Sequence, residues 1–220
     1  MNDRASKWFR SRRLPTWRLW LIILTLVGGL AALLLPKTYG WLAVTERVDG
    51  AKYVVVEGWV NDYVLTAAVQ EFDDLDAKLL LTTGLPLDRG QALSEYKDYA
   101  TLAANSIARA GGMEAGKIYP VPAPSAARER TAAMATALKT ALEAMNIPAE
   151  EKKIQLITSS THARRSRAMY QRMLGPEWQV GVVSVPDISY PSDQWYRHSS
   201  GAKGVIDELV ALTIVYLGGE

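Results

Sequence analysis

The apolar positions of this chain form one long uncharged run near the N-terminus and a series of short runs after residue 50. The long run covers residues 19–35 and is followed by Pro36. As an α-helix it spans about 26 Å, close to the roughly 30 Å hydrocarbon core of a bilayer. Aromatic residues typical of the membrane interface flank it on both sides: Trp17, Trp20, Tyr39 and Trp41. The pattern therefore predicts a transmembrane helix at residues 19–35, with the lipid bilayer as its partner.

The charges before this run predict its orientation. Six of the 25 Lys and Arg residues lie in residues 1–18, together with one of the 23 acidic residues. Basic residues favour the cytoplasmic end of a membrane helix, so we expect residues 1–18 to be a cytoplasmic tail and the rest to be extracytoplasmic. A cleaved signal peptide and a buried core helix are the alternatives. The residues after Pro36 fit a cleavage site poorly, and the run lacks the polar stripe of a core helix.

Composition then limits the classes of function. The net charge is +2, but without residues 1–18 the chain has 19 basic against 22 acidic residues, which argues against nucleic-acid binding. There is no cysteine and there are only two histidines, which disfavours a disulfide framework, a thiolate site and a His-rich zinc centre. No cofactor is firmly implied, while a carboxylate-held divalent cation stays open.

After a linker at residues 36–50, strand-like and helix-like segments alternate through residues 51–220. Short aliphatic runs predict strands at residues 52–57, 78–83, 117–121, 153–158 and 180–185. Helices are predicted at residues 62–74, 93–110, 126–145, 161–174 and 204–217. Continuous apolar strands are typical of parallel sheets that are covered on both faces. We therefore expect an α/β fold, a Rossmann-like three-layer domain with a doubly wound, mainly parallel five-stranded sheet.

Ligands of such sheets bind beyond the carboxyl ends of the strands, so the residues at those ends are the candidate site. The first predicted strand ends at Glu57 and is followed by Trp59, and the second is followed by Gly84. The fourth ends at Thr158 and is followed by Ser159 and His162. We expect His162 to act as a general acid or base, and Glu57 to position water or a metal. For Glu57, a purely structural carboxylate is the alternative.

Arginines gather where two predicted helices begin. Arg128 and Arg130 open the helix after the third strand, and Arg164 and Arg165 open the helix after the fourth. The positive end of the helix dipole disfavours cations there, unless an anion binds between the two helices. His162 and Arg165 are three residues apart and share a helical face. The pattern predicts an anion site, with solvated or carboxylate-paired arginines as the alternative.

Motifs for several enzyme classes are missing. The chain has no G-x-S-x-G elbow, no Walker loop and no G-x-G-x-x-G fingerprint, which disfavours a serine hydrolase, a P-loop enzyme and a dinucleotide oxidoreductase. Whether the protein is an enzyme is left open. For an enzyme we expect phosphoryl or pyrophosphoryl hydrolysis or transfer, with Arg128, Arg130 and Arg165 holding the anion. Residues 195–198 form an aromatic, cationic loop suited to a lid, a sugar-stacking surface or a membrane contact.

The order of these motifs resembles the SanA/ElyC/YdcF family of bacterial envelope proteins. The family pattern has a strand ending T-S-x-Y-H with an arginine three residues later, and this chain has T-S-S-T-H at residues 158–162 followed by Arg165. Other positions that resemble the family are Gly84, Glu95, Thr131 and Glu208. The chain departs from the pattern at Thr161, where tyrosine is usual, and at Met134, where asparagine is common. For Glu208 a solvent-side position is the alternative to a site role.

The resemblance covers residues 51–217 and implies a Rossmann-like domain that faces the periplasm from the bacterial inner membrane. It also implies a role in envelope or peptidoglycan biogenesis. With it, the candidate ligand-binding residues are Trp59, Gly84, Arg128, Arg130, Thr131, Thr158, Ser159, Arg165 and Glu208.

We expect the ligand to be an anionic, phosphorylated envelope precursor, such as a polyprenyl-phosphate-linked sugar. A non-catalytic sensor or assembly factor is one alternative. A domain that binds a nucleotide or S-adenosylmethionine, as reported for a soluble family member, is another. It would need an acidic residue at a strand end to meet a ribose, and Glu57 is the early candidate.

Overall fold

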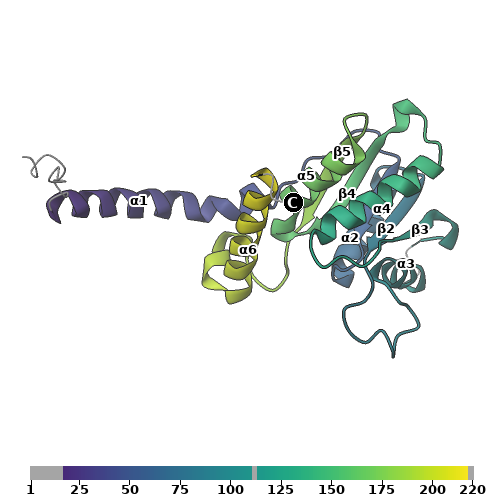
Figure 1. Ribbon diagram of the computed structural model, residues 1–220, viewed down its shortest axis with the longest axis horizontal. Coiled ribbons are helices and arrows are strands. Elements are labelled where there is room, and N and C mark those ends of the chain that lie inside the picture. The colour runs from purple at the N-terminus through teal and green to yellow at the C-terminus, as the bar shows by residue number, and fades with distance from the viewer. Residues whose placement is uncertain (1–16, 111–112, 218–220) are drawn as a thin grey trace, which may run out of the picture. The chain divides into compact units, whose positions relative to one another are not determined.

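The computed structural model describes residues 17–110 and 113–217, and the chain forms two units, residues 1–37 and residues 38–220. Helix α1 (Trp17–Leu42) provides the described part of the first unit and the first residues of the second (Figure 1). Its 26 residues correspond to a length of about 39 Å. The most apolar part of α1 has no buried residue. Helix α1 is thus long and apolar enough to cross a membrane.

In the second unit, five strands form one sheet in which every pair is parallel (Figure 1). The order across the sheet is β3-β2-β1-β4-β5. The strands are β1 (Tyr53–Glu57), β2 (Leu79–Gly84), β3 (Ile118–Pro122), β4 (Lys153–Ser159) and β5 (Gln179–Val185). The predicted α/β class and the five-stranded parallel sheet are confirmed, and the layout is compatible with a Rossmann-like fold.

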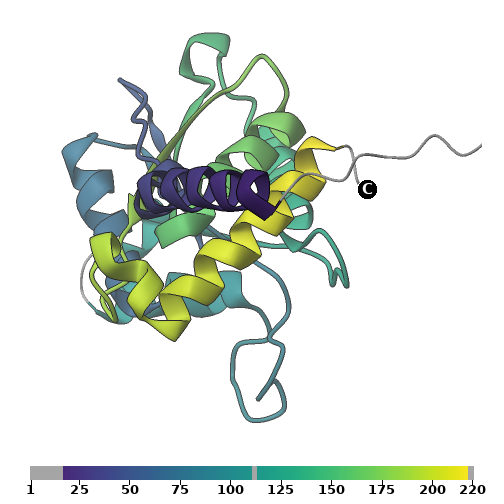
Figure 2. The ribbon, with the colours of Figure 1, turned by 90° about the vertical axis from the view of Figure 1, so that its left-hand side faces the viewer.

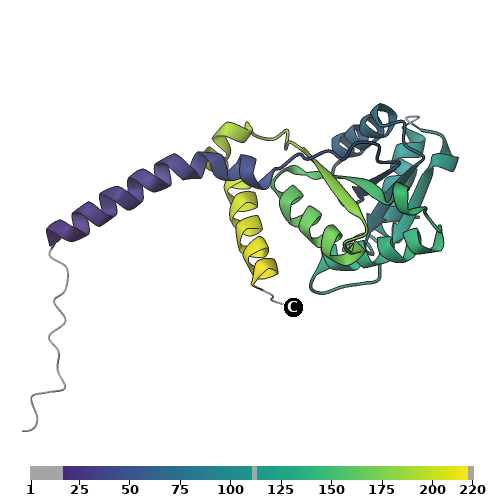
Figure 3. The same cartoon turned by 90° about the horizontal axis from the view of Figure 1, so that it is seen from above.

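Helices cover both faces of this sheet, which gives three layers (Figure 3). Helices α2 (Asp62–Asp74) and α3 (Tyr99–Arg109) pack on the face that carries Val54 and Val56. Helices α4 (Arg130–Ala144) and α5 (Ala163–Leu174) pack on the opposite face, with Val55 and Leu156. Successive residues of a strand point to opposite faces, so a continuous apolar run fills both cores at once.

Helix α6 (Ser199–Tyr216) belongs to a third, smaller core. It follows a segment that includes a 3₁₀ turn, Ser192–Arg197, and Figure 2 shows this turn leading into α6. The buried residues of this core are Tyr39, Leu42, Tyr190, Trp195, Val205 and Leu212. Trp195 is buried here, so the predicted aromatic loop contributes to packing as well as to the surface.

The structure differs from the predicted boundaries at several helix ends. Helix α1 continues through Pro36 to Leu42, and Glu46 then pairs with Val182 in an antiparallel bridge along the edge of β5. The predicted linker at residues 36–50 is therefore part of the helix and of the sheet edge. An exposed edge strand is a risk for aggregation, and this segment covers it.

The helix predicted at residues 93–110 begins only at Tyr99, because Asp98 caps it by accepting a 2.7 Å hydrogen bond from the Thr101 amide. Glu95 therefore lies in the preceding loop, outside a helix. Helix α4 begins at Arg130, since Glu129 has a left-handed backbone (φ 52°) that interrupts the helix predicted from residue 126. Helix α6 begins at Ser199, five residues before the predicted start.

Gly84 has a packing role at the end of β2. A Cβ atom at this position would lie 2.7 Å from the carbonyl carbon of Tyr99, at the start of α3. Only glycine allows this close approach of a helix to a strand end. Gly84 thus fixes where α3 begins, and with it the wall of the site that Tyr99 provides.

Candidate functional site

The order in which the chain adds strands reverses at the centre of the sheet, between β1 and β4. From β1 the chain proceeds outward through β2 and β3, and then crosses back to β4 and β5 on the other side of β1. Ligands of doubly wound sheets bind beyond the carboxyl ends of the strands at such a point. Here the two strand ends are joined, because Thr158 of β4 donates a 2.5 Å hydrogen bond to the Glu57 carboxylate of β1.

Glu57 is completely buried behind the site. Its second carboxylate oxygen accepts a 3.0 Å hydrogen bond from the Ser166 hydroxyl of α5, and its first lies 3.6 Å from Nε2 of His162. A buried carboxylate is tolerated when hydrogen-bond donors and a nearby basic group compensate its charge. Because Glu57 has no exposed surface, it does not reach the cavity. The predicted contact of Glu57 with water or a metal is therefore replaced by a role behind His162.

The layer behind Glu57 adds no further charge. Burial raises the pKa of Tyr170 well above its ordinary value of 10, and the nearby Glu57 carboxylate raises it as well. The phenol therefore stays neutral and shares a 2.9 Å hydrogen bond with the Thr83 hydroxyl at the end of β2. Glu57 is thus the charged group that faces His162 from the interior.

A strained turn brings His162 to the site. Ser160, directly after β4, has a left-handed backbone (φ 51°), which costs a residue with a side chain about 1 kcal/mol. Neighbours hold the turn in place: the Ser160 hydroxyl donates to the Tyr39 hydroxyl at 3.0 Å, and the Ser160 carbonyl accepts from the Ser184 hydroxyl at 2.8 Å. The turn places His162 immediately before α5, with its ring at the cavity.

Glu208 connects α6 to this histidine. One Glu208 oxygen lies 2.7 Å from Nδ1 of His162. The Arg165 guanidinium donates to both oxygens, at 2.7 Å and 3.1 Å, and donates at 3.2 Å to the hydroxyl of Thr131 on α4. The Glu208 side chain is only 13% exposed, so the structure rejects the solvent-side alternative for this residue. One network therefore joins four side chains: Thr131 of α4, Arg165 of α5, Glu208 of α6 and His162 of the turn before α5.

The network determines which nitrogen of His162 carries the proton in the neutral ring. Glu208 is a carboxylate and can only accept, so Nδ1–H must donate to it. Arg165 has only donors, so its 2.9 Å approach to Nδ1 is a close contact and not a hydrogen bond. The lone pair of the neutral imidazole is therefore at Nε2, on the side of Glu57. A histidine held in this way accepts a proton at Nε2 and returns it, while two carboxylates stabilise the imidazolium.

Glu208 stays ionised over the whole physiological range. Burial raises its pKa. The hydrogen bonds from His162 and Arg165, together with the charges of these groups, lower the pKa by a larger amount, so that it is about 2. A carboxylate that bidentate arginine and imidazole both bind is held in its charged form. Glu208 is thus a fixed acceptor that orients the ring, and it does not itself exchange protons near neutral pH.

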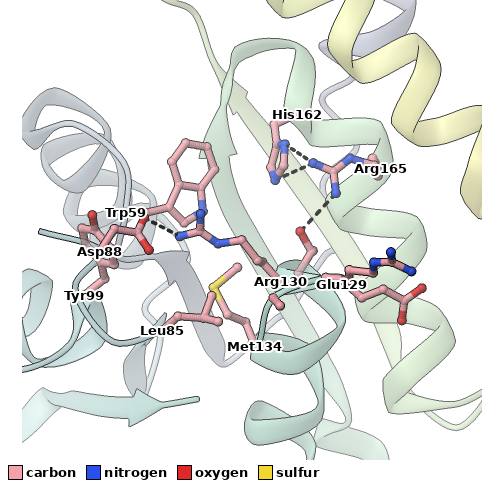
Figure 4. A pocket seen from close by; sticks show the side chains of 12 residues that line it. Trp59, Leu85, Asp88, Tyr99, Glu129, Arg130, Met134, His162 and Arg165 are labelled. Atoms are coloured by element: carbon pink, nitrogen blue, oxygen red, sulfur yellow. Dashed lines mark hydrogen bonds and ion pairs between the residues drawn. The ribbon is translucent and has the colours of Figure 1, made fainter. Parts of the chain in front are cut away.

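A cavity of about 500 Å³ opens in front of His162 (Figure 4). Its walls come from the ends of β1, β2 and β4 and from the segment that precedes α4. The lining residues are Trp59, Leu85, Asp88, Tyr99, Ala127, Arg128, Glu129, Arg130, Thr131, Met134, His162 and Arg165. The Trp59 indole meets the His162 ring edge to face, with centroids 5.0 Å apart and planes at 82°. The cavity therefore combines an aromatic wall, one imidazole, three guanidinium groups and the carboxylates of Asp88 and Glu129.

The structure brings about half of the predicted site residues to this cavity. Those that line it are Trp59, Arg128, Arg130, Thr131, His162 and Arg165. Thr158 and Glu208 act from behind through Glu57, His162 and Arg165. Gly84 and Ser159 do not line the cavity.

The arginines do not gather as the sequence suggests. Arg164 turns away, donates to the Trp41 carbonyl and places its guanidinium 4.4 Å from the centre of the Trp41 ring. Arg130 pairs with Asp88 at 3.0 Å in an exposed ion pair, and Figure 4 shows its side chain extended toward Asp88 and Trp59. Arg165 is bound by Glu208. Among residues 17–110 and 113–217, Arg128 makes no hydrogen bond or ion pair, and it is the cation that remains available to a ligand.

Two structural residues of the site were not predicted from the sequence. Ser166 donates to Glu57, and Tyr170 lies in contact with the same buried layer. Their spacing offers a signal, because Ser166 and Tyr170 follow His162 at intervals of four residues and so share its helical face. Within the described part of the chain no group of three or more His, Cys, Asp or Glu residues forms a metal site, so the open prediction of a divalent cation gains no ligand set.

Comparison of the chain with protein-family models and with curated proteins gives no match in either case.

Replacing Glu208 by glutamine tests the network through the pH dependence of stability. The folded-state pKa of about 2 lies below the ordinary value of 4.5, so the carboxylate contributes stability that is complete above pH 4.5 and is lost as the pH falls toward 2. The difference corresponds to about 3 kcal/mol. We expect Glu208→Gln to lower the free energy of unfolding by this order at pH 7, and the gap to wild type to shrink below pH 4.5.

Urea unfolding of the full chain in detergent, repeated from pH 7 to pH 2, measures this gap. Glu143→Gln, which removes an exposed carboxylate on α4, is the matched control and should change stability by less than about 0.5 kcal/mol at every pH. A Glu208→Gln curve that stays parallel to wild type over the whole range would contradict the network.

Proposed function

We propose that this protein is a single-pass inner-membrane protein whose extracytoplasmic domain binds a phosphorylated cell-envelope precursor. We further propose that it is a distant member of the SanA/ElyC/YdcF family, since T-S-S-T-H and Arg165 lie at the switch point of the sheet. The observation that carries the proposal is the oriented His162 in a cavity beside the uncapped beginning of α4. A phosphate at that helix end would share the cavity with the unpaired Arg128 guanidinium and the His162 imidazole.

The beginning of α4 is the part of the cavity best suited to an anion. No side chain caps this helix, so the N–H groups of its first turn remain available to a ligand. The helix has 15 residues, and its dipole favours negative charge at this end. Thr131, in the first turn, adds a hydroxyl, and Arg128, which makes no ion pair with any described residue, adds a guanidinium. These groups bind a phosphate by hydrogen bonds and by charge.

We predicted from the sequence that Arg128, Arg130 and Arg165 together hold the anion. The ion pairs that Arg130 and Arg165 form in the structure change this prediction. The Arg130–Asp88 pair is exposed on both sides, and such pairs contribute only about 0–1 kcal/mol. A phosphate of the ligand can therefore replace Asp88 as the partner of Arg130. Arg165 is held by the part-buried Glu208, so it positions His162 and does not clamp the anion.

The same geometry suits phosphoryl or pyrophosphoryl hydrolysis or transfer. In that reaction the His162 imidazole, oriented by Glu208, takes the proton of the attacking water or hydroxyl and returns it to the leaving oxygen. The developing imidazolium lies between Glu208 and Glu57, at 2.7 Å and 3.6 Å, which stabilises the charge. A sensor or assembly factor would use the same pocket to bind without turnover, so the two are separated by the activity of the His162 variant.

The structure counts against the nucleotide or S-adenosylmethionine alternative. That alternative depends on Glu57 meeting a ribose at the strand end. Glu57 is fully buried and both of its oxygens already accept hydrogen bonds from Thr158 and Ser166. The carboxylate is therefore not offered to a ligand.

Ligand-shifted melting of the full chain in detergent tests the binding proposal. We expect a polyprenyl-phosphate-linked sugar at about one hundred times its Kd to stabilise the wild type by about 2.7 kcal/mol, which raises Tm by roughly 5–10 °C. Arg128→Gln should lose most of this shift, because it removes the unpaired cation. His162→Ala should keep much of the shift but abolish any turnover.

Arg164→Gln is the matched control, since Arg164 is one residue from Arg165 but faces Trp41. It should retain the full ligand shift. Equal shifts in wild type and Arg128→Gln would exclude the proposed anion site, and a shift with nucleotides alone would favour a different ligand class.

Reporter fusions test the proposed orientation. A β-lactamase joined after Gly50 should be active only if this point lies outside the cytoplasm, and we expect the fusion to confer ampicillin resistance. An alkaline phosphatase fusion at the same residue should also be active. Inactive fusions at Gly50, with an active cytoplasmic reporter there, would reverse the orientation.

A further inference from the structure

Helix α6 exposes an apolar stripe that no described residue covers. Its members are Ile206, Val210 and Ile214 of α6 and Leu217, the residue after its end, which are 58%, 57%, 52% and 81% exposed. Intervals of three and four residues place side chains on one face of a helix. Exposed apolar residues are unremarkable one at a time, but a continuous stripe along a helix marks a contact surface.

The other side of α6 is apolar as well. Val205 and Leu212 are buried in the third core, and Leu209 packs against it. From Leu209 to Leu217 the chain contains no charged residue. The charged residues of α6, Lys203, Asp207 and Glu208, all lie before this segment. A helical segment that is apolar on all sides is found where protein or lipid surrounds it, so the outer face of the second half of α6 requires an occupant.

The chain itself indicates that this occupant is lipid. Val205 and Leu212 pack in one core with Tyr39 and Leu42, which close α1. Tyr39 follows the last residue of the uncharged run, Leu35, by four residues, which span at most about 14 Å even when extended. If α1 crosses the bilayer, this chain connection keeps Tyr39, and the core that it shares with Val205 and Leu212, close to the membrane surface.

Aromatic and cationic groups beside the stripe fit the same layer. Trp41, beside the buried Leu42, and Tyr216, at the end of α6, are both exposed, and Arg164 lies over the Trp41 ring. Amphipathic aromatic rings and long basic side chains are typical of the boundary between headgroups and acyl chains.

We propose that α6 is an interfacial helix whose face formed by Ile206, Val210, Ile214 and Leu217 lies in the headgroup–acyl boundary of the membrane that α1 enters. This docking does not depend on the proposed ligand. Combined with the proposed function, it has a consequence for the site: α6 carries Glu208, so the helix that orients His162 is the one that docks on the membrane. The substrate class that follows is a lipid-linked phosphate, taken from the membrane surface.

Because the chain has no cysteine, single labelling sites can be introduced into the full-length protein. Val210→Cys and Ile214→Cys carry an environment-sensitive NBD probe on the stripe. Ala144→Cys, at the exposed end of α4, is the matched control. All three proteins are reconstituted in vesicles of phosphatidylethanolamine and phosphatidylglycerol, with and without lipids that carry a nitroxide quencher at a shallow acyl position.

We expect the probes at residues 210 and 214 to show blue-shifted emission and to lose most of it in quencher vesicles, while the probe at residue 144 stays unquenched. Probes on the stripe that are as water-exposed as the control would overturn the proposal. So would disulfide cross-linking of unlabelled Val210→Cys into dimers with no lipid quenching, since a second copy of the chain would then be the occupant. Loss of ligand-shifted melting with intact quenching would refute the proposed ligand and leave the docking in place.

Discussion

The contact between Glu208 and His162 joins the parts of this protein that are distant in the sequence. It links α6 to the turn after β4, and through Arg165 and Thr131 it extends to the beginning of α4. The carboxylate compensates two basic groups at once, which is why its pKa falls to about 2 in spite of burial. Without it, the imidazole would lose its fixed tautomer and Arg165 would be a part-buried cation without a carboxylate partner.

The sheet and the location of the site can be predicted from local sequence patterns. The side-chain partners within the site cannot. Short apolar runs predict the strands because each one fills two cores, and the switch point then selects the ends of β1 and β4. The burial of Glu57 and the role of Glu208 depend on how α5 and α6 pack, which no local spacing encodes. Arg164 and Arg165 are neighbours in the sequence, yet one lies on Trp41 and the other on Glu208.

Charge is balanced more tightly at the site than the arginine-rich sequence implies. Asp88 pairs with Arg130, Glu208 pairs with Arg165, and Glu57 faces His162. The attraction for an anion is therefore concentrated at the uncapped start of α4 and at Arg128, and the remaining charges serve to orient the imidazole. This division separates binding from proton transfer, so that each can be removed by a different substitution.

Nitrogen NMR of the histidine ring tests the central role of Glu208 most directly. The chain contains only His162 and His198, so a ¹⁵N-histidine-labelled sample of the full chain gives two ring systems, with His198 as an internal reference. At a pH where the rings are neutral, the Glu208 contact requires His162 to carry its proton on Nδ1, and this preference should disappear in Glu208→Leu, whose side chain has no acceptor. A proton on Nε2 in the wild type, or the same tautomer in both proteins, would contradict the proposed network.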